Sequence, residues 1–138
     1  MAIRFPIAML CGVSAYMVAV VMTVYDGLLS VLFQPVVGLI LTAIACASLL
    51  VVASPLLIPA AWKVWRRAWP LPLLIAIGGV AAMLLSWHPA LRVQVWDPDN
   101  QIWFESFQPA LAIGGWVGML FGILWMPKLA ISQDGRWA

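Results

Sequence analysis

The sequence predicts an all-α integral membrane protein, a four-transmembrane-helix bundle with a short β-hairpin-like outer loop between its third and fourth helices. Three observations predict it. First, 65% of the 138 residues are hydrophobic, only 9% are charged and the mean hydropathy is +1.05, whereas a soluble domain carries about 25% charged residues. Second, four long stretches of the sequence contain no charged residue. Third, the lysines and arginines gather on one side of the predicted bundle. This composition excludes a soluble enzyme, a soluble nucleic-acid-binding protein and a disordered tail.

Four uncharged stretches are long enough, or nearly long enough, to cross a bilayer. They are residues 5–25, 35–59, 70–87 and 109–126. A spanning helix needs about 20 apolar residues, with about 17 as the lower limit. The third and fourth stretches lie near that limit, so we expect them to stand steeply in the bilayer. All 138 residues then form a single transmembrane domain.

Proline placement sets the predicted helix boundaries. Five prolines are placed at helix starts, where the absent N–H costs no hydrogen bond: Pro6, Pro35, Pro70, Pro72 and Pro109. Four are placed at or beyond helix ends: Pro55, Pro59, Pro89 and Pro127. Pro55 alone is expected to lie inside a helix, in the last turn of the second one. No proline falls at the centre of a predicted helix. This favours a plain bundle over the broken helices that transporters use.

Positive charges orient the bundle, because cytoplasmic loops are enriched in lysine and arginine. All of them except Arg92 fall on one side: Arg4, Lys63, Arg66, Arg67, Lys128 and Arg136. The other side collects the acids Asp26, Asp97, Asp99 and Glu105. We therefore place both termini and the central basic loop on the cytoplasmic side of the inner (plasma) membrane. The first apolar run exceeds the usual signal-peptide core, so we expect an uncleaved first helix.

The central basic loop interleaves cations with tryptophans. Lys63, Arg66 and Arg67 are expected to contact lipid headgroups of the inner leaflet, where each cation contributes about 1 kcal/mol. Tryptophans mark the same interface, at Trp62, Trp65, Trp69 and Trp125, and aromatic residues mark the outer one, at Trp87, Trp103 and Phe107. A patch this short does not favour binding of RNA or DNA.

The outer loop, residues 88–108, has the period-two pattern of a β-hairpin. Residues 92–96 and 101–105 alternate around the turn sequence Asp97-Pro98-Asp99-Asn100. An isolated hairpin is marginally stable in water, so this one needs support. Either Trp96 and Trp103 dock on a partner, or they pack on the protein's own helices.

The fourth apolar stretch carries a glycine stripe. Gly114, Gly118 and Gly122 are spaced by four, which predicts one helix face that another backbone approaches closely. We expect an internal contact, although a contact with another subunit stays open, and we expect leucine at each of the three to act alike. Milder stripes run through Gly38, Thr42 and Cys46 and through Gly78, Ala82 and Ser86.

The chemistry of an enzyme is not expected. Asp26 sits at the outer edge of the first stretch, and no ionisable residue lies deep inside any stretch, which argues against a proton-coupled carrier. Cys11, Cys46 and His88 lack the spacing of a metal site. One histidine cannot form a bis-histidine haem, although a single axial bond from His88 to a pigment or haem stays open. We expect no catalytic, cofactor-binding or metal-binding residue.

The predicted function is a non-catalytic accessory, assembly or stabilising subunit of a larger membrane complex. Its partners would be the lipid bilayer and other membrane subunits, and not nucleic acid. One alternative is a small homo-oligomeric transporter or channel, with a pore lined by serine, threonine, Tyr16 and backbone. Another is a membrane immunity or exclusion protein.

Overall fold

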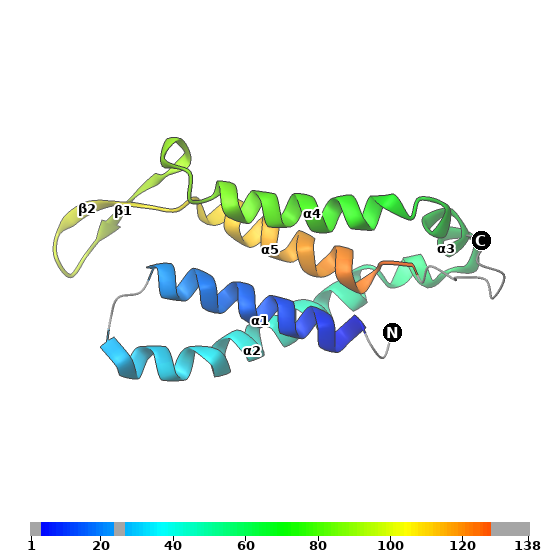
Figure 1. Ribbon diagram of the computed structural model, residues 1–138, viewed down its shortest axis with the longest axis horizontal. Helices are drawn as coiled ribbons and strands as arrows, with labels where there is room; N and C mark the ends of the chain where they lie inside the picture. Colours follow the sequence, from blue (N-terminus) through cyan, green and yellow to red (C-terminus); the bar gives the residue numbers. More distant parts are fainter. Residues whose placement is uncertain (1–3, 24–26, 128–138) are drawn as a thin grey trace, which may run out of the picture.

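The computed structural model describes residues 4–23 and 27–127. These residues are mostly helical, with one small β-hairpin, as the sequence predicts (Figure 1). In chain order the elements are α1 (Arg4–Thr23), α2 (Gly27–Val52), the 3₁₀ turn η1 (Ser54–Leu57), α3 (Pro59–Arg67), α4 (Pro70–Leu85), the 3₁₀ turn η2 (Pro89–Leu91), β1 (Val93–Asp97), β2 (Ile102–Ser106) and α5 (Pro109–Leu124).

Two helices are long and apolar enough to cross a membrane, over Arg4–Met22 in α1 and Leu32–Val52 in α2. Helices α4 and α5 are apolar, but each has 16 residues. At about 1.5 Å per residue that is about 24 Å, short of a hydrocarbon core of about 30 Å. Helix α4 passes the same test only together with α3, from which it bends by 70°. The described residues therefore contain two clear candidate spans, and four spans remain a prediction.

The predicted boundaries of the second helix are wrong at its start. Pro35 was expected to open it, but α2 begins at Gly27 and contains Pro35 in its interior. The residues before the proline are mostly apolar and continue the helix. An interior proline lacks the N–H that would donate to the carbonyl of Val31, and its ring crowds that carbonyl, yet the helix continues through Pro35.

The end of the second stretch is also different from the prediction. Helix α2 stops at Val52, and Pro55 lies in the first turn of η1 rather than in the last turn of α2. Pro59, expected at a helix end, opens α3. Proline suits that first position because its φ is already helical. The expected basic loop is therefore a helix whose last turn holds Arg66 and Arg67, a favourable place for cations.

Helix α5 is the centre of the arrangement, since it packs on α4, on α1 and on α2, while α1 and α2 pack on each other. Figure 1 shows the start of α1, helix α3 and the end of α5 toward one end of the molecule. The hairpin of β1 and β2 lies at the opposite end, beyond α4 and α5. We call these the basic end and the hairpin end.

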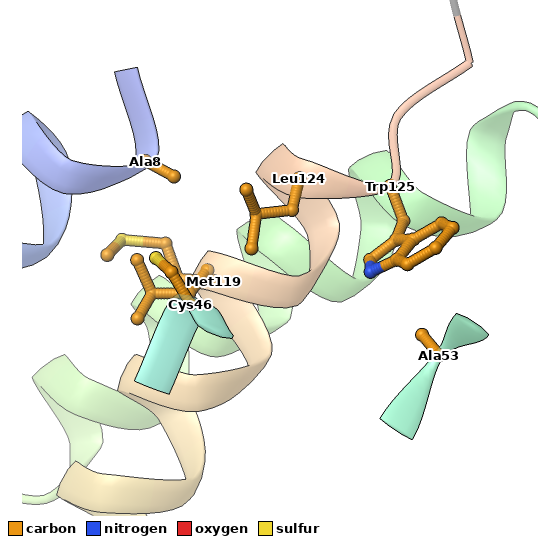
Figure 2. Close-up of a cluster of buried hydrophobic side chains, with 7 residues drawn as sticks. Ala8, Cys46, Ala53, Met119, Leu124 and Trp125 are labelled. Atoms are coloured by element: carbon orange, nitrogen blue, oxygen red, sulfur yellow. The ribbon is translucent and has the colours of Figure 1, made fainter. Parts of the chain in front are cut away.

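The buried core is small and lies toward the basic end. Its members are Ala8, Cys46, Ala53, Met119, Leu120, Leu124 and Trp125 (Figure 2). Most large apolar side chains point outward instead, and Leu10, Val51 and Leu84 are each more than 70% exposed. Only 17% of the residues in each candidate span are buried. The outside of the helices is therefore as apolar as the inside.

Candidate functional site

The hairpin that the alternating sequence predicts is present, and each strand begins and ends one residue later than the alternating segments 92–96 and 101–105. Strands β1 and β2 pair antiparallel, with Val95 opposite Phe104 and Trp96 opposite Trp103. Directly paired residues share a face of the hairpin. One face therefore carries Val95 with Phe104, and the other carries the two tryptophans.

The turn is built around Asp97, as its sequence predicts. The carboxylate accepts hydrogen bonds from the backbone N–H of Asp99, at 2.9 Å, and from the side-chain amide of Asn100, at 2.7 Å. These bonds favour the ionised form, so they lower the pKa of Asp97, with the amide of Asn100 as the main cause. Gln101 completes the turn with a φ of 53°, a conformation that costs a non-glycine residue some strain.

The base of the hairpin is joined to the helices. The backbone N–H of Gln108 donates to the carbonyl of Ser86 at 2.9 Å, which ties the start of α5 to the end of α4. The rings of Trp87 and Phe107 stack with centroids 5.1 Å apart. Beyond these contacts β1 and β2 pack mainly on each other, and Figure 1 shows them projecting past the helix ends.

The two tryptophans of the hairpin are exposed. Their ring centroids lie 5.3 Å apart, yet Trp96 is 44% and Trp103 64% accessible. On the opposite face Phe104 is also 44% accessible. The protein's own helices do not cover these side chains. An exposed aromatic pair on a hairpin with two unpaired strand edges is a surface suited to binding.

The three glycines of the predicted stripe do not share one environment. A Cβ on Gly122 would overlap the carbonyl of Pro72 and lie 2.7 Å from the Cβ of Ala76. At Gly118 the nearest atom would be the Cα of Gly79, at 3.8 Å, which is ordinary contact. At Gly114 nothing lies within 4 Å. The expectation that leucine acts alike at all three is therefore wrong.

In the close contact between α4 and α5, Gly115 lies where the predicted stripe has Gly114. Gly115 and Gly79 are both buried, and a Cβ on either one would overlap the other's carbonyl oxygen. The reason is geometric: each step of four turns about 40° around a helix, so Gly114 and Gly122 diverge by about 80°. Gly115 and Gly122, seven apart, diverge by only about 20°.

A polar contact that the sequence-based predictions did not include joins α1 to α2. The hydroxyl of Tyr16 donates to Oε1 of Gln34 at 2.6 Å. A Cβ on Gly38 would overlap the ring of Tyr16, and one on Gly12 would overlap Cγ2 of Thr42. In each helix a glycine is followed, four residues later, by the side chain that packs against the glycine of the other helix. Gly12 precedes Tyr16 in α1, and Gly38 precedes Thr42 in α2. That shared spacing was a signal available in the sequence.

The third helix of this contact is α5. The indole N–H of Trp116 donates to the backbone carbonyl of Gly12 at 3.0 Å, and the buried hydroxyl of Thr42 donates to the carbonyl of Gly38 at 2.6 Å. These polar groups are thus hydrogen-bonded, as the cost of burying them demands, whereas the buried indole N–H of Trp125 has no hydrogen-bond partner among the described residues. The milder stripe of Gly38, Thr42 and Cys46 is fully on the buried side of α2.

A shallow groove of about 260 Å³ runs between α4 and α5 on their outer side. Small residues form most of its wall, among them Gly78, Ala82, Ala110 and Gly114. Like Gly114, Gly78 has nothing within 4 Å of a built Cβ. The glycines that do not pack α4 on α5 therefore line this open groove.

The basic residues lie together on α3, at the end opposite the hairpin. Lys63, Arg66 and Arg67 are exposed, whereas Trp65 is partly buried and packs against the core. Its indole N–H donates to the carbonyl of Trp125 at 2.8 Å, and its ring meets that of Phe121 edge to face at 5.9 Å.

His88 has a local structural contact. It precedes η2, and its Nδ1 accepts the backbone N–H of Ala90 at 3.3 Å. Within residues 4–23 and 27–127 no three His, Cys, Asp or Glu side chains are grouped as a metal site would require. Three residues used to orient the chain, Asp26, Lys128 and Arg136, lie outside the described residues.

Comparison with known proteins gives a partial likeness. Over 109 residues, 77% of this chain, the sequence is 33% identical to the tRNA (34-2'-O)-methyltransferase regulator WDR6 of Homo sapiens and of Pongo abelii. The protein of the same name from Rattus norvegicus is 30% identical over 109 residues. The chain spans only 8% of the length of these curated relatives. No family model matches the chain, and no solved structure matches it.

Proposed function

We propose that this protein is a four-helix membrane protein that serves as a non-catalytic accessory, assembly or stabilising subunit of a larger membrane complex. In this proposal α1, α2, α4 and α5 cross the inner membrane, α3 and both termini are cytoplasmic, and the hairpin lies outside. The hairpin binds the outer part of a partner subunit. The observation that carries the proposal is the exposed pair of Trp96 and Trp103 on a hairpin that its own helices leave uncovered.

The apolar exterior supports a membrane location. Soluble monomers rarely expose apolar patches beyond a few hundred Å², whereas exposed large apolar side chains occur along α1, α2 and α4. The grouping of charges supports the orientation. The described acids Asp97, Asp99 and Glu105 belong to the hairpin, and the cations of α3 lie at the other end, as the enrichment of cytoplasmic loops in lysine and arginine requires.

The short helices α4 and α5 are compatible with spanning. Trp87 and Phe107 stack at the hairpin end of this pair, and Trp65 and Trp125 meet at its basic end. Aromatic residues at both ends are typical of membrane interfaces, and a bilayer thins locally around a short span at a modest energetic cost.

Reporter fusions test the topology. A fusion after Arg67 is expected to report the cytoplasm, and a fusion after Asp99 the outside. The two fusion points are separated by α4 alone among the helices of the bundle, so opposite signals require that α4 crosses the membrane. A cytoplasmic signal after Asp99 contradicts the four-span proposal.

Co-purification tests the docking role. The double variant Trp96→Ala, Trp103→Ala should insert normally but lose associated chains after mild detergent extraction, because aromatic anchors often contribute about 2 kcal/mol or more each to an interface. The matched control is Trp69→Ala, since Trp69 is 48% exposed but lies next to α3. Unchanged association in the double variant contradicts a docking role for the hairpin.

The same extraction separates the alternatives. Unlike chains in the native mass support an accessory subunit. A clean homo-oligomer that passes solutes in liposomes supports a transporter or channel, and a monomer that binds an incoming toxin or genetic element supports an immunity or exclusion protein.

A further inference from the structure

Helix α3 has two chemically opposite faces. Lys63, Arg66 and Arg67 are related by steps of three and four residues, so they lie within a sector of about 100° around the helix. Trp62 and Trp65 lie on the other side and pack against the core. Such a helix presents a continuous cationic stripe beside an apolar one.

The direction of α3 follows from its angle to α4. The axes of the two helices turn by 70° at the break between Arg67 and Pro70. With α4 crossing the membrane, as the proposed function has it, α3 lies close to parallel with the membrane surface. A helix in that position, with cations on one face and tryptophan on the other, is typical of an interfacial amphipathic helix.

Trp65 fixes the rotation of α3 about its own axis through a hydrogen bond and a ring contact, and Trp62 packs against the core beside it. The indole N–H of Trp65 donates to the carbonyl of Trp125 at 2.8 Å, and the ring meets Phe121 at the end of α5. With Trp65 held against α5, the cations are left on the accessible side of α3, and all three are exposed. The cationic face is thus positioned before any ligand arrives.

No carboxylate neutralises this face within residues 4–23 and 27–127. The acids described there, Asp97, Asp99 and Glu105, are part of the hairpin at the opposite end. The ion pair that the described residues form joins Arg92 to Glu105, 3.7 Å apart, also in the hairpin. Among the described residues, the stripe of Lys63, Arg66 and Arg67 is therefore not paired with a carboxylate, and it is exposed to an external anion.

Apolar side chains surround the cationic stripe and are exposed as well. Val64 on α3 is 68% accessible, Ile58 just before it is 58%, and Trp69 just after it is 48%. A ligand that is only an anion would leave these side chains in water. A ligand that joins an anionic group to acyl chains covers both kinds of surface.

We propose that α3 is a binding site for anionic phospholipid, in which Lys63, Arg66 and Arg67 bind the headgroup phosphates and Val64 and Trp69 contact the acyl-chain boundary. Trp65 is a positioning residue, since it holds the helix and does not touch the lipid phosphate. This site rests on the proposed membrane location. It does not depend on a partner for the hairpin.

Native mass spectrometry of the full-length protein in neutral detergent tests the site. Phosphatidylglycerol, which is anionic, is titrated against phosphatidylcholine, which has no net charge. Each cation near an anionic surface is expected to tighten binding about fivefold, so the preference for phosphatidylglycerol should be about 100-fold. The triple variant Lys63→Gln, Arg66→Gln, Arg67→Gln should abolish it, and the preference should weaken as salt is raised.

Two matched variants complete the test. Arg92→Gln removes a cation at the hairpin end and should leave the lipid preference unchanged. Trp65→Phe keeps an aromatic ring but removes the N–H, and it should lower the preference several-fold although all three cations remain. Inorganic phosphate at the lipid concentration should not compete, because it lacks the acyl chains. The helical circular dichroism signal verifies that each variant is folded.

Three outcomes would overturn the proposal: equal affinity of the wild type for both lipids, an unchanged preference in the folded triple variant, or full competition by inorganic phosphate. Failure of the proposed function is a separate result. It appears as a cytoplasmic reporter signal after Asp99, whereas the lipid preference is measured on the purified protein.

Discussion

The helix pairs α4–α5 and α1–α2 both use glycine to bring helices close together, but they fill the contact differently. Between α4 and α5, glycine faces glycine: Gly79 and Gly115 are so close that a Cβ on either one would overlap the backbone of the other helix. Between α1 and α2, each glycine faces a side chain, Gly38 the ring of Tyr16 and Gly12 the methyl group of Thr42.

The difference decides how each contact responds to change. A backbone atom opposite a glycine cannot move without moving its whole helix, because packed interiors leave little free space. A side chain opposite a glycine can rotate. The α1–α2 pair also gains a hydrogen bond from Tyr16 to Gln34, and α5 joins α1 through the hydrogen bond from Trp116 to the carbonyl of Gly12. The glycine contact of the first pair therefore depends on shape, with a backbone hydrogen bond from Gln108 to Ser86 at its hairpin end, whereas the second pair depends on shape together with a side-chain hydrogen bond.

The largest effect is expected for Gly115→Leu. Its side chain would have to occupy the space of the Gly79 carbonyl and the backbone nitrogen of Met83, so α4 and α5 must separate. We expect a loss of about 3 kcal/mol, measured as a lower thermal midpoint of the helical signal in mild detergent. Gly122→Leu should behave alike, because Gly122 faces Pro72 and Ala76. Wild-type stability in both variants would show that these helices do not pack closely.

One added methyl group compares the two pairs directly. Gly79→Ala is expected to destabilise by about 2 kcal/mol, since its Cβ would lie 2.6 Å from the backbone nitrogen of Met119. Gly38→Ala should cost less than about 1 kcal/mol, because the ring of Tyr16 can rotate away. The same thermal unfolding measurement serves for both. Equal losses would remove the distinction between backbone and side-chain neighbours.

Tyr16→Phe tests the polar part of the α1–α2 contact. It keeps the ring that fills Gly38 and removes the hydroxyl that donates to Gln34. Hydrogen bonds between helices in membranes contribute about 0.6 kcal/mol on average, so the expected loss is of that size. A double-mutant cycle with Gln34→Leu measures the coupling between the two side chains. An additive double variant would mean that the hydrogen bond does not contribute to stability.

The smallest effect is expected for Gly114→Leu. Nothing lies within 4 Å of a Cβ at this position, so thermal stability should change by less than about 0.5 kcal/mol. It is the matched control for Gly115→Leu, one residue away on the same helix. A loss of co-purifying chains without a loss of stability would identify the groove beside Gly114 as a contact with another subunit. A loss of stability would contradict the orientation of α5.

Much of the architecture could be predicted from the sequence, because the responsible forces are local. Long apolar runs predict helices, and proline marks the starts of α4 and α5 correctly at Pro70 and Pro109. The alternation of residues 92–96 and 101–105 around the turn at Asp97 predicts the hairpin, whereas the structure shows which residues pair, Trp96 with Trp103 among them. Side-chain period and turn chemistry act over a few residues, so a sequence alone is enough to determine them.

Only the tertiary structure decided the interior of α2, the form of the basic segment and the choice between adjacent glycines. Pro35 is tolerated because the helix around it is otherwise continuous. Helix α3 is stabilised where Trp65 meets the end of α5, sixty positions away in the chain. Gly115 rather than Gly114 faces α4, since the rotation of one helix against another depends on side chains from both. Periodicity predicts that small residues gather on a helix, but only packing determines which of them is buried.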